Sequence, residues 1–182
     1  MKEQEMIDLL RHYRHDWLNE LQLLIGYVQM GKIDKVEEKL KENVSSAQEE
    51  RMLSNLNVPK TALWMISFNW RYDNFRIKYN VGTLNKDISE KDKELHNLLE
   101  ALMQLLTQYG EIMELYQGNI NIFQEQELVK CMVSFVGTFN ESDKLVEQLK
   151  QLDGNPSVTT SLNSDELNKY TITWVLNKRG DL

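Results

Sequence analysis

Residues 11–31 read R-H-Y-R-H-D-W-L-N-E-L-Q-L-L-I-G-Y-V-Q-M-G, and this stretch decides how the chain folds. Apolar residues recur at every third or fourth position, the spacing that seals one helix against others. The sequence therefore predicts a helix from Glu3 to Met30 that stops at Gly31, a residue suited to the left-handed conformation after a helix. Its core-facing seam is predicted to consist of Leu10, Trp17, Leu21, Leu24 and Val28.

Another side of this helix is polar and is centred on His15. A solvated helix face accounts for most histidines in such a position. Here Gly26 lies inside the helix, where glycine costs about 0.5–1 kcal/mol relative to alanine and leaves the backbone bare. A partner can approach a bare backbone closely, so this side is predicted to be a docking surface. The polar strip comprises Asp8, Arg11, His12, His15, Asn19, Gln22 and Gly26.

A metal site is the second alternative for the strip, because His12 and His15 are three residues apart and Asp8 is one turn earlier. Carboxylate metal sites in helical bundles usually carry Glu three residues before His. Leu9 precedes His12 at that spacing, and Arg11 and Arg14 would repel a cation. The two guanidinium groups instead suit an acidic or phosphorylated partner.

A second helix begins at Ile33, almost directly after the first, so the first 55 residues are predicted to form a helical hairpin. Two helices cannot bury apolar seams on both arms, and soluble proteins avoid such exposed patches. The hairpin is therefore predicted to dimerise into a four-helix bundle, with two His15 residues on opposite outer faces. Counting from the turn near Lys32 places Glu49 to Arg51 level with His15 on the return arm.

The remainder of the chain is predicted to be α/β. Pro59 starts a helix to about Tyr72, and from Phe75 the apolar period changes from helical to alternating. Ser89 and Asp92 resemble a capping box before a helix from Leu95 to Tyr109, on which His96 is taken as structural. Further predicted elements are strands Phe75–Val81, Asn119–Gln124, Leu128–Gly137, Pro156–Leu162 and Tyr170–Asn177, and a helix Ser142–Leu152.

These elements give an α+β fold class with a mostly antiparallel sheet in its second half. The predicted segments are residues 1–56 as the hairpin, 57–73 as a linking helix and 74–182 as the α/β domain. The 182 residues carry 28 acidic and 21 basic side chains, a net charge of −7 that argues against a nucleic-acid binder. Cys131 lies in an apolar run and is predicted to be a buried side chain. A single cysteine is typical of a protein in a reducing compartment.

The N-terminus has charges interleaved with apolar residues, unlike a signal peptide, and no run of 18 apolar residues occurs. A cytoplasmic location without a membrane span is expected.

The region around His15 resembles a known family. The residues His15-Asp16-Trp17-Leu18-Asn19, with Leu21-Gln22-Leu23 and Gly26 after them, resemble the phosphoacceptor helix of the sporulation initiation phosphotransferase B family of spore-forming bacteria. Leu53-Ser54-Asn55-Leu56 and Phe68-Asn69-Trp70 extend the likeness. The resemblance implies that the α/β domain is similar to a degenerate ATP-binding domain of histidine kinases.

The resemblance also implies a phosphorelay phosphotransferase with His15 as the phosphoacceptor. A single-domain response regulator would be the donor, and the receiver domain of the sporulation transcription factor the acceptor. Asn19, one turn from His15, is expected to assist, and Asp16 could orient or deprotonate the ring although consecutive helical residues do not share a face. The predicted partner-binding residues are Arg11, His12, Arg14, Gln22, Leu23, Gly26, Tyr27, Glu50 and Arg51.

Nucleotide binding separates a kinase from a phosphotransferase. The helix of residues 95–109 has Gln104 and Gln108 where the kinase domain carries asparagine, and the loop Asp153-Gly154-Asn155-Pro156 has one glycine followed by a proline that lacks a backbone donor. We therefore expect no cofactor of its own, and any Mg²⁺ to lie in the partner's acidic pocket. A cytoplasmic sensor histidine kinase and a non-catalytic dimeric adaptor for receiver domains remain the alternatives.

Overall fold

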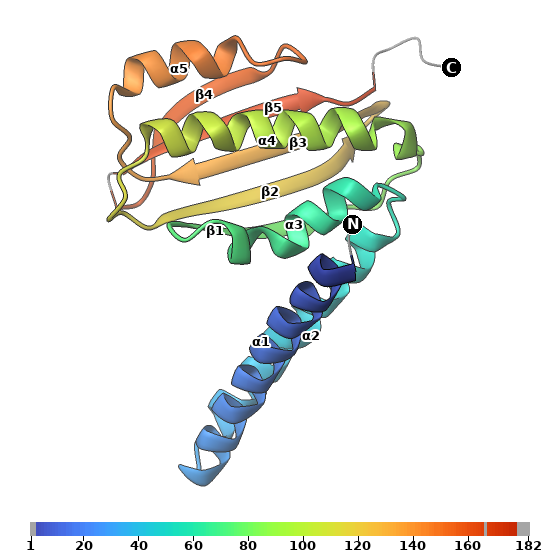
Figure 1. The fold of residues 1–182 in the computed structure, drawn as a ribbon, viewed down its shortest axis with the longest axis vertical. Coiled ribbons are helices and arrows are strands. Elements are labelled where there is room, and N and C mark those ends of the chain that lie inside the picture. The colour runs from blue at the N-terminus through green and yellow to red at the C-terminus, as the bar shows by residue number, and fades with distance from the viewer. Residues whose placement is uncertain (1–2, 166, 178–182) are drawn as a thin grey trace. The chain divides into compact units, whose positions relative to one another are not determined.

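The computed structural model of the protein describes residues 3–165 and 167–177; the outer ends of the predicted segments 1–56 and 74–182 lie outside this range. Contacts divide the chain into two units, the first ending at Glu50 and the second beginning at Arg51. The elements (Figure 1) are α1 Glu3–Gln29, α2 Ile33–Ser54, α3 Pro59–Arg71, β1 Phe75–Val81, η1 Ser89–Lys91, α4 Asp92–Tyr109, β2 Tyr116–Glu125, β3 Leu128–Val136, α5 Ser142–Lys150, β4 Ser157–Leu162 and β5 Asn168–Val175.

The predicted helical hairpin is confirmed, and its turn has a defined geometry. Gly31 adopts a φ of +68°, the left-handed conformation expected after a helix. Its N–H donates to the carbonyl of Val28 at 3.0 Å, and the N–H of Lys32 donates to the carbonyl of Tyr27 at 2.9 Å. These two bonds form a Schellman motif, which ends α1 at Gln29 and lets α2 begin at Ile33.

The predicted core-facing seam of α1 is mostly exposed in the single chain. No residue of α1 is buried, and Leu10 and Trp17 are 58% and 56% exposed. The side of α1 that packs on α2 is displaced around the helix, because Lys39 of α2 pairs with Glu20 at 3.1 Å. Leu24 and Tyr27 are half-buried on that side. The seam read from the sequence is therefore mostly an exposed apolar face.

The second unit contains a five-stranded sheet in the order β1-β2-β3-β5-β4. Only β1 and β2 are parallel, and the other neighbours are antiparallel, as the sequence predicted. β2 begins at Tyr116, earlier than the predicted Asn119, and Gly118 explains the difference. A Cβ on Gly118 would lie 2.4 Å from the ring of Phe135 on β3, so the glycine makes room for an aromatic side chain inside a strand.

One face of the sheet is covered by α3, α4 and α5, which gives the unit two layers (Figure 1). Alternate residues of β2 and β3 point into this layer, among them Tyr116, Ile120, Val133 and Phe135. Aromatic rings fill one end of the core. Tyr116 stacks on Phe75 and on Phe139, with centroids 4.8 Å and 4.3 Å apart.

Helix α3, which the sequence predicts as a separate linking segment, packs within the α/β unit. Trp64, Met65 and Phe68 are buried in the core of that unit. Contacts divide the two units at residue 50, within α2, while the second helix of the hairpin continues to Ser54. The mostly apolar sequence of α3 is explained by this burial.

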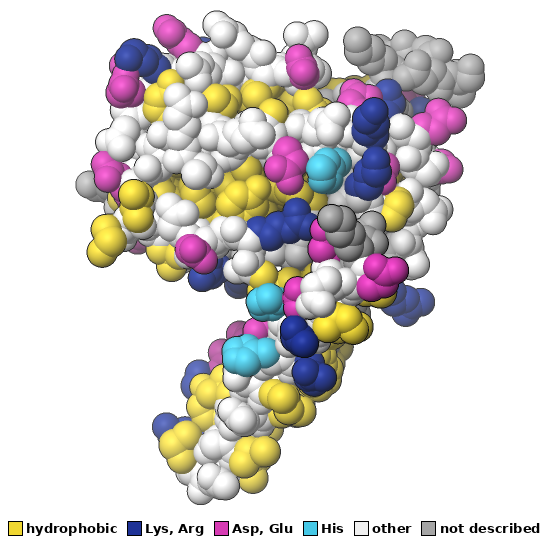
Figure 2. All heavy atoms as spheres, viewed as in Figure 1, with side chains coloured by type: hydrophobic (Ala, Val, Ile, Leu, Met, Phe, Trp, Pro, Cys, Tyr) yellow, Lys and Arg dark blue, Asp and Glu magenta, His cyan; other side chains and the backbone are white. Residues whose placement is uncertain are grey.

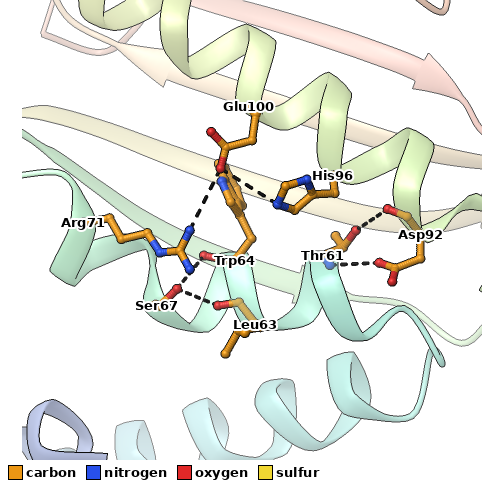
Figure 3. Close-up of polar contacts among 8 residues, drawn as sticks. All are labelled: Thr61, Leu63, Trp64, Ser67, Arg71, Asp92, His96 and Glu100. Carbon is orange, nitrogen blue, oxygen red and sulfur yellow. Dashed lines mark hydrogen bonds and ion pairs between the residues drawn. The ribbon is translucent and has the colours of Figure 1, made fainter. Parts of the chain in front are cut away.

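Asp92 joins α4 to α3 (Figure 3). Its carboxylate accepts hydrogen bonds from the backbone N–H groups of Lys60 at 3.0 Å and Thr61 at 2.9 Å, while the Thr61 hydroxyl donates to the Asp92 carbonyl at 3.2 Å. The predicted capping box with Ser89 is therefore wrong. Asp92 caps the N-terminus of α3 and makes no side-chain cap of its own helix.

Cys131 is buried on β3, as predicted, and burial raises the pKa of its thiol to about 12. A thiol with such a pKa is almost entirely protonated at neutral pH and is a poor nucleophile.

Replacing Asp92 by Ala is expected to lower the free energy of unfolding by about 1–3 kcal/mol, because two N–H groups at the start of α3 lose a charged acceptor. Urea denaturation followed by circular dichroism measures this. Glu90→Ala, which removes an exposed carboxylate nearby, is the matched control and should change stability little. Equal unfolding midpoints for the two variants would contradict the capping role.

Candidate functional site

The polar strip of α1 lies on the surface of the hairpin. Figure 2 shows the exposed histidine side chains of the hairpin beside Lys and Arg side chains. His12, His15 and Asn19 are all exposed. Helix geometry sets them at three- and four-residue intervals, so their side chains follow one another along one line of the surface.

The imidazole of His15 is highly accessible, with 72% of its side chain exposed. Its Nδ1 atom lies 3.3 Å from Oδ1 of Asp16 and 3.2 Å from Nδ2 of Asn19. Asp16 and Asn19 therefore both contact the ring at Nδ1. Nε2 lies on the other edge of the ring and is the nitrogen that a partner can approach.

The two contacts of Nδ1 favour different tautomers of a neutral ring. A carboxylate only accepts hydrogen bonds, so the Asp16 contact requires a proton on Nδ1 and leaves the lone pair on Nε2. An amide N–H donated by Asn19 requires the lone pair on Nδ1 and therefore the proton on Nε2. An amide can present its oxygen instead after a flip, so Asn19 is compatible with both tautomers and Asp16 with one.

Asp16 reaches the ring even though it follows His15 directly in the sequence. Its carboxylate extends sideways across the helix surface, and 55% of the side chain is exposed. Spacing alone disfavoured this contact, because adjacent helical residues point about 100° apart. The structure brings Asp16, His15 and Asn19 together in one cluster.

The turn before His15 is also ordered by side-chain contacts. Arg11 Nη1 lies 2.9 Å from Oδ1 of Asp8, which also accepts a hydrogen bond from Gln4 at 3.1 Å. Nδ1 of His12 lies 2.8 Å from the backbone carbonyl oxygen of Asp8. Arg14 is exposed on the same turn.

On the return arm, the hydroxyl of Tyr13 donates to Oε2 of Glu50 at 3.4 Å. Burial against α2 and the neighbouring Glu50 carboxylate raise the pKa of the Tyr13 phenol. Because Tyr13 is two residues before His15, Glu50 lies about half a turn from the level of His15. Arg51, the other predicted footprint residue of α2, is exposed.

The predicted footprint residues at the far end of α1 differ in their placement. Gln22 and Leu23 are exposed, whereas Tyr27 is half-buried on the side that packs on α2 and lies off the strip. A Cβ added at Gly26 would meet nothing within 4 Å. The hairpin itself therefore does not need a glycine at this position.

Sequence reasoning missed two contacts that fix the hairpin, the Glu20 pair with Lys39 and the Tyr13 bond to Glu50. Tyr13, Glu20 and Tyr27 are spaced by seven residues and therefore lie on one side of the helix. This spacing could have indicated that Glu20 lies at the interface with α2.

The loop Asp153-Gly154-Asn155-Pro156 has a packing role. Gly154 has a φ of +76°, and a Cβ on it would lie 2.9 Å from Cδ1 of Trp174. The indole N–H of Trp174 donates to the carbonyl of Asp153 at 3.0 Å. This glycine is required for the turn and for the close approach of an indole ring.

Within residues 3–165 and 167–177, no group of three His, Cys, Asp or Glu side chains is placed to hold a metal ion. None of the helices in that part of the chain is long and apolar enough to span a membrane.

Among solved structures, the histidine kinase AdeS of Acinetobacter baumannii is 14% identical, with 90% of this chain and 98% of that chain covered and a TM-score of 0.40. A blue-light activated histidine kinase of Erythrobacter litoralis is 13% identical, with 100% and 63% covered and a TM-score of 0.45.

Sporulation initiation phosphotransferase B of Bacillus subtilis (strain 168) is 40% identical over 104 residues, which are 57% of this chain and 54% of that protein. The match thus spans about half the length of the relative. Residues 1–56 match the family described as Sensor_kinase_SpoOB-type, alpha-helical domain. Residues 57–172 match Sporulation initiation phospho-transferase B, C-terminal. Together these two matches cover nearly the whole chain, which therefore belongs to the sporulation initiation phosphotransferase B family.

Proposed function

We propose that this protein is a phosphorelay phosphotransferase of sporulation, in which His15 takes a phosphoryl group from the aspartate of one response regulator and passes it to the aspartate of a second. The observation that carries the proposal is the exposed His15 ring, whose side-chain contacts with Asp16 and Asn19 are both at Nδ1 and therefore on the edge of the ring away from Nε2. The similarity to sporulation initiation phosphotransferase B of Bacillus subtilis supports the same activity.

The chemistry requires little from the protein beyond position and charge. Nε2 attacks the phosphorus of an aspartyl phosphate, the new P–N bond forms as the P–O bond to the aspartate breaks, and the electron pair leaves on the carboxylate. The proton stays on Nδ1 beside Asp16, whose negative charge stabilises the positive charge that develops on the ring. The return step reverses these changes toward the second aspartate. Mg²⁺ bound in the receiver's acidic pocket would neutralise the phosphoryl oxygens.

The chain is further proposed to act as a homodimer. Exposed apolar side chains continue along both arms of the hairpin, including Leu21 on α1 and Leu40 and Val44 on α2. At about 100° per residue, His15 lies about 140° around α1 from Leu10. A second copy can therefore cover the apolar face without covering the strip, and the same face on both copies suits a two-fold axis.

The surface around His15 is proposed to be the partner footprint. Arg11 and Arg14 would complement an acidic receiver surface. Exposed Gln22 and half-buried Gly26 extend the strip toward the turn of the hairpin. The donor is proposed to be a single-domain response regulator and the acceptor the receiver domain of the sporulation transcription factor.

His15→Gln is expected to stay folded and to take no label from a phosphorylated receiver domain, because glutamine has no nucleophilic ring nitrogen. Transfer of radiolabelled phosphate, followed on gels, measures this against His96→Gln, which should accept label like the wild type. A receiver that keeps all its label with wild-type protein would refute the proposal. Labelling of wild type from ATP alone would indicate a histidine kinase, and full function of His15→Gln would indicate an adaptor.

Asp16→Asn is expected to slow the uptake of phosphate by tenfold or more, because the ring loses the one neighbour that requires a proton on Nδ1. Asn19→Ala should slow it less, since Asn19 is compatible with both tautomers. Single-turnover transfer from a labelled receiver gives both rates. An Asp16→Asn rate equal to that of the wild type would contradict the role of this carboxylate.

Leu21→Glu is expected to convert the dimer to a monomer, because it places a charge in the middle of the apolar face. Sedimentation velocity of the full chain measures the oligomeric state. Gln22→Glu introduces the same charge on the neighbouring residue of the strip and should remain dimeric. A monomeric wild type, or a Leu21→Glu variant that dimerises equally well, would rule out this interface.

A further inference from the structure

The two edges of the sheet in the α/β unit differ in how their backbone groups are covered. At the β1 edge, the side chain of Asn69 on α3 bonds to the backbone of Ile77. Its Oδ1 accepts a hydrogen bond from the N–H of Ile77 at 2.9 Å, and its Nδ2 donates to the carbonyl of Ile77 at 3.3 Å. At the opposite edge, β4 pairs with β5, and no described strand lies beyond it. The outer side of β4 is therefore an open edge.

The hydrogen bonds around β4 show which backbone groups face outward. The N–H of Asn163 donates to the carbonyl of Leu167 at 2.9 Å, which continues the pairing of β4 with β5 by one position. In an antiparallel ladder, every second residue of a strand bonds to the same neighbour. The odd-numbered residues of β4 therefore bond to β5. The even-numbered residues direct their N–H and carbonyl groups out of the sheet; they are Val158, Thr160 and Leu162.

The open edge lacks the features that usually prevent another strand from pairing. Native proteins protect such edges with charged side chains, proline or a bulge. Residues 157–162 read S-V-T-T-S-L and contain neither a charge nor a proline, although 27% of the whole chain is charged. Their register with β5 is continuous, so the strand has no bulge, and all but Val158 are exposed. An edge of this kind can accept an added strand.

The sequence of β4 is complementary to a second copy of itself. If two β4 strands run antiparallel with Thr160 opposite Thr160, every outward group meets an outward group, and each facing pair exchanges two hydrogen bonds. Val158 then lies opposite Leu162 of the second copy. Val158 pairs with buried Ile172 of β5, so this apolar pair lies on the helix-covered face of the sheet. Leu162 is 66% exposed in the single chain and gains an apolar neighbour.

Charge also favours a second copy at this edge. The chain has a net charge of −7, so two copies repel each other over most of their surfaces. On the open face of the sheet, the same register sets Thr159 opposite Ser161 of the second copy, and hydroxyl side chains are favourable cross-strand neighbours. Two copies can therefore meet along β4 without placing like charges opposite each other.

We propose that the open edge of β4 is a self-association site, to which the β4 strand of a second copy adds in the antiparallel register centred on Thr160. A strand of this length buries much less surface than the about 1,600 Å² of a standard interface. The association is therefore weak and requires a high protein concentration, whereas the apolar face of the hairpin sets the oligomeric state in dilute solution. Edge pairing would join dimers formed through the hairpin into larger assemblies.

The test compares amide hydrogen exchange of the ¹⁵N-labelled full chain at millimolar and at tens of micromolar concentration. At the higher concentration, the N–H groups of Val158, Thr160 and Leu162 are expected to exchange about threefold more slowly or slower still, because a second copy bonds to them. The N–H groups of Thr159 and Ser161 bond to β5 at both concentrations and are the internal control. Pairing through the hairpin would change the exchange of α1 and α2 instead, so the two interfaces are read separately.

Thr160→Pro removes one outward N–H and leaves the bonds to β5 in place, a position at which an edge strand tolerates proline. This variant should lose the concentration dependence at Val158 and Leu162. Thr160→Ala, which keeps the N–H, is the matched control and should retain it.

Equal exchange of the outward N–H groups at both concentrations in the wild type would overturn the inference. Slower exchange in dilute solution that appears only when a phosphorylated receiver domain is added would also overturn it, since the edge would then belong to that partner. Transfer of phosphate to His15 tests the proposed function independently, so either idea can fail without the other.

Discussion

The physical constraint behind this structure is that one helix paired with one other helix can bury only one of its sides. Helix α1 buries no residue in the single chain. One side contacts α2 through Glu20 and Tyr13, a second is apolar and exposed, and a third is the polar strip with His15. Each of the three sides is available for a different kind of contact. Packing within the chain, pairing between chains and contact with a phosphoryl donor do not compete for the same residues.

Local patterns in the sequence predicted the elements well. The turn at Gly31, the break before Pro59 and the alternation in Phe75–Val81 each depend on residues within a few positions, and the structure confirms all three. The identity of His15 as the central residue also came from local spacing, since the strip is a property of one helix. Its role in phosphotransfer stays a prediction.

Other features could not be read from the sequence because their partners are distant along the chain. Asp92 looked like part of a capping box with Ser89, yet its carboxylate is used by Lys60 and Thr61, more than thirty residues earlier. The sequence did not show which side of α1 faces α2, because the period of apolar residues is the same whether they face α2 or a second chain. The ion pair between Glu20 and Lys39 and the bond from Tyr13 to Glu50 identify the side that faces α2.

The burial of Cys131 has a practical consequence for studying this protein. The chain has a single cysteine, and its thiol is enclosed in the sheet and remains protonated at neutral pH. The native protein is therefore expected not to react with maleimides or methanethiosulfonates, so no cysteine has to be removed by mutagenesis first. A cysteine placed at Gln22 would accept a fluorophore or spin label as the sole reactive thiol, and could report the arrival of another protein on the strip in real time.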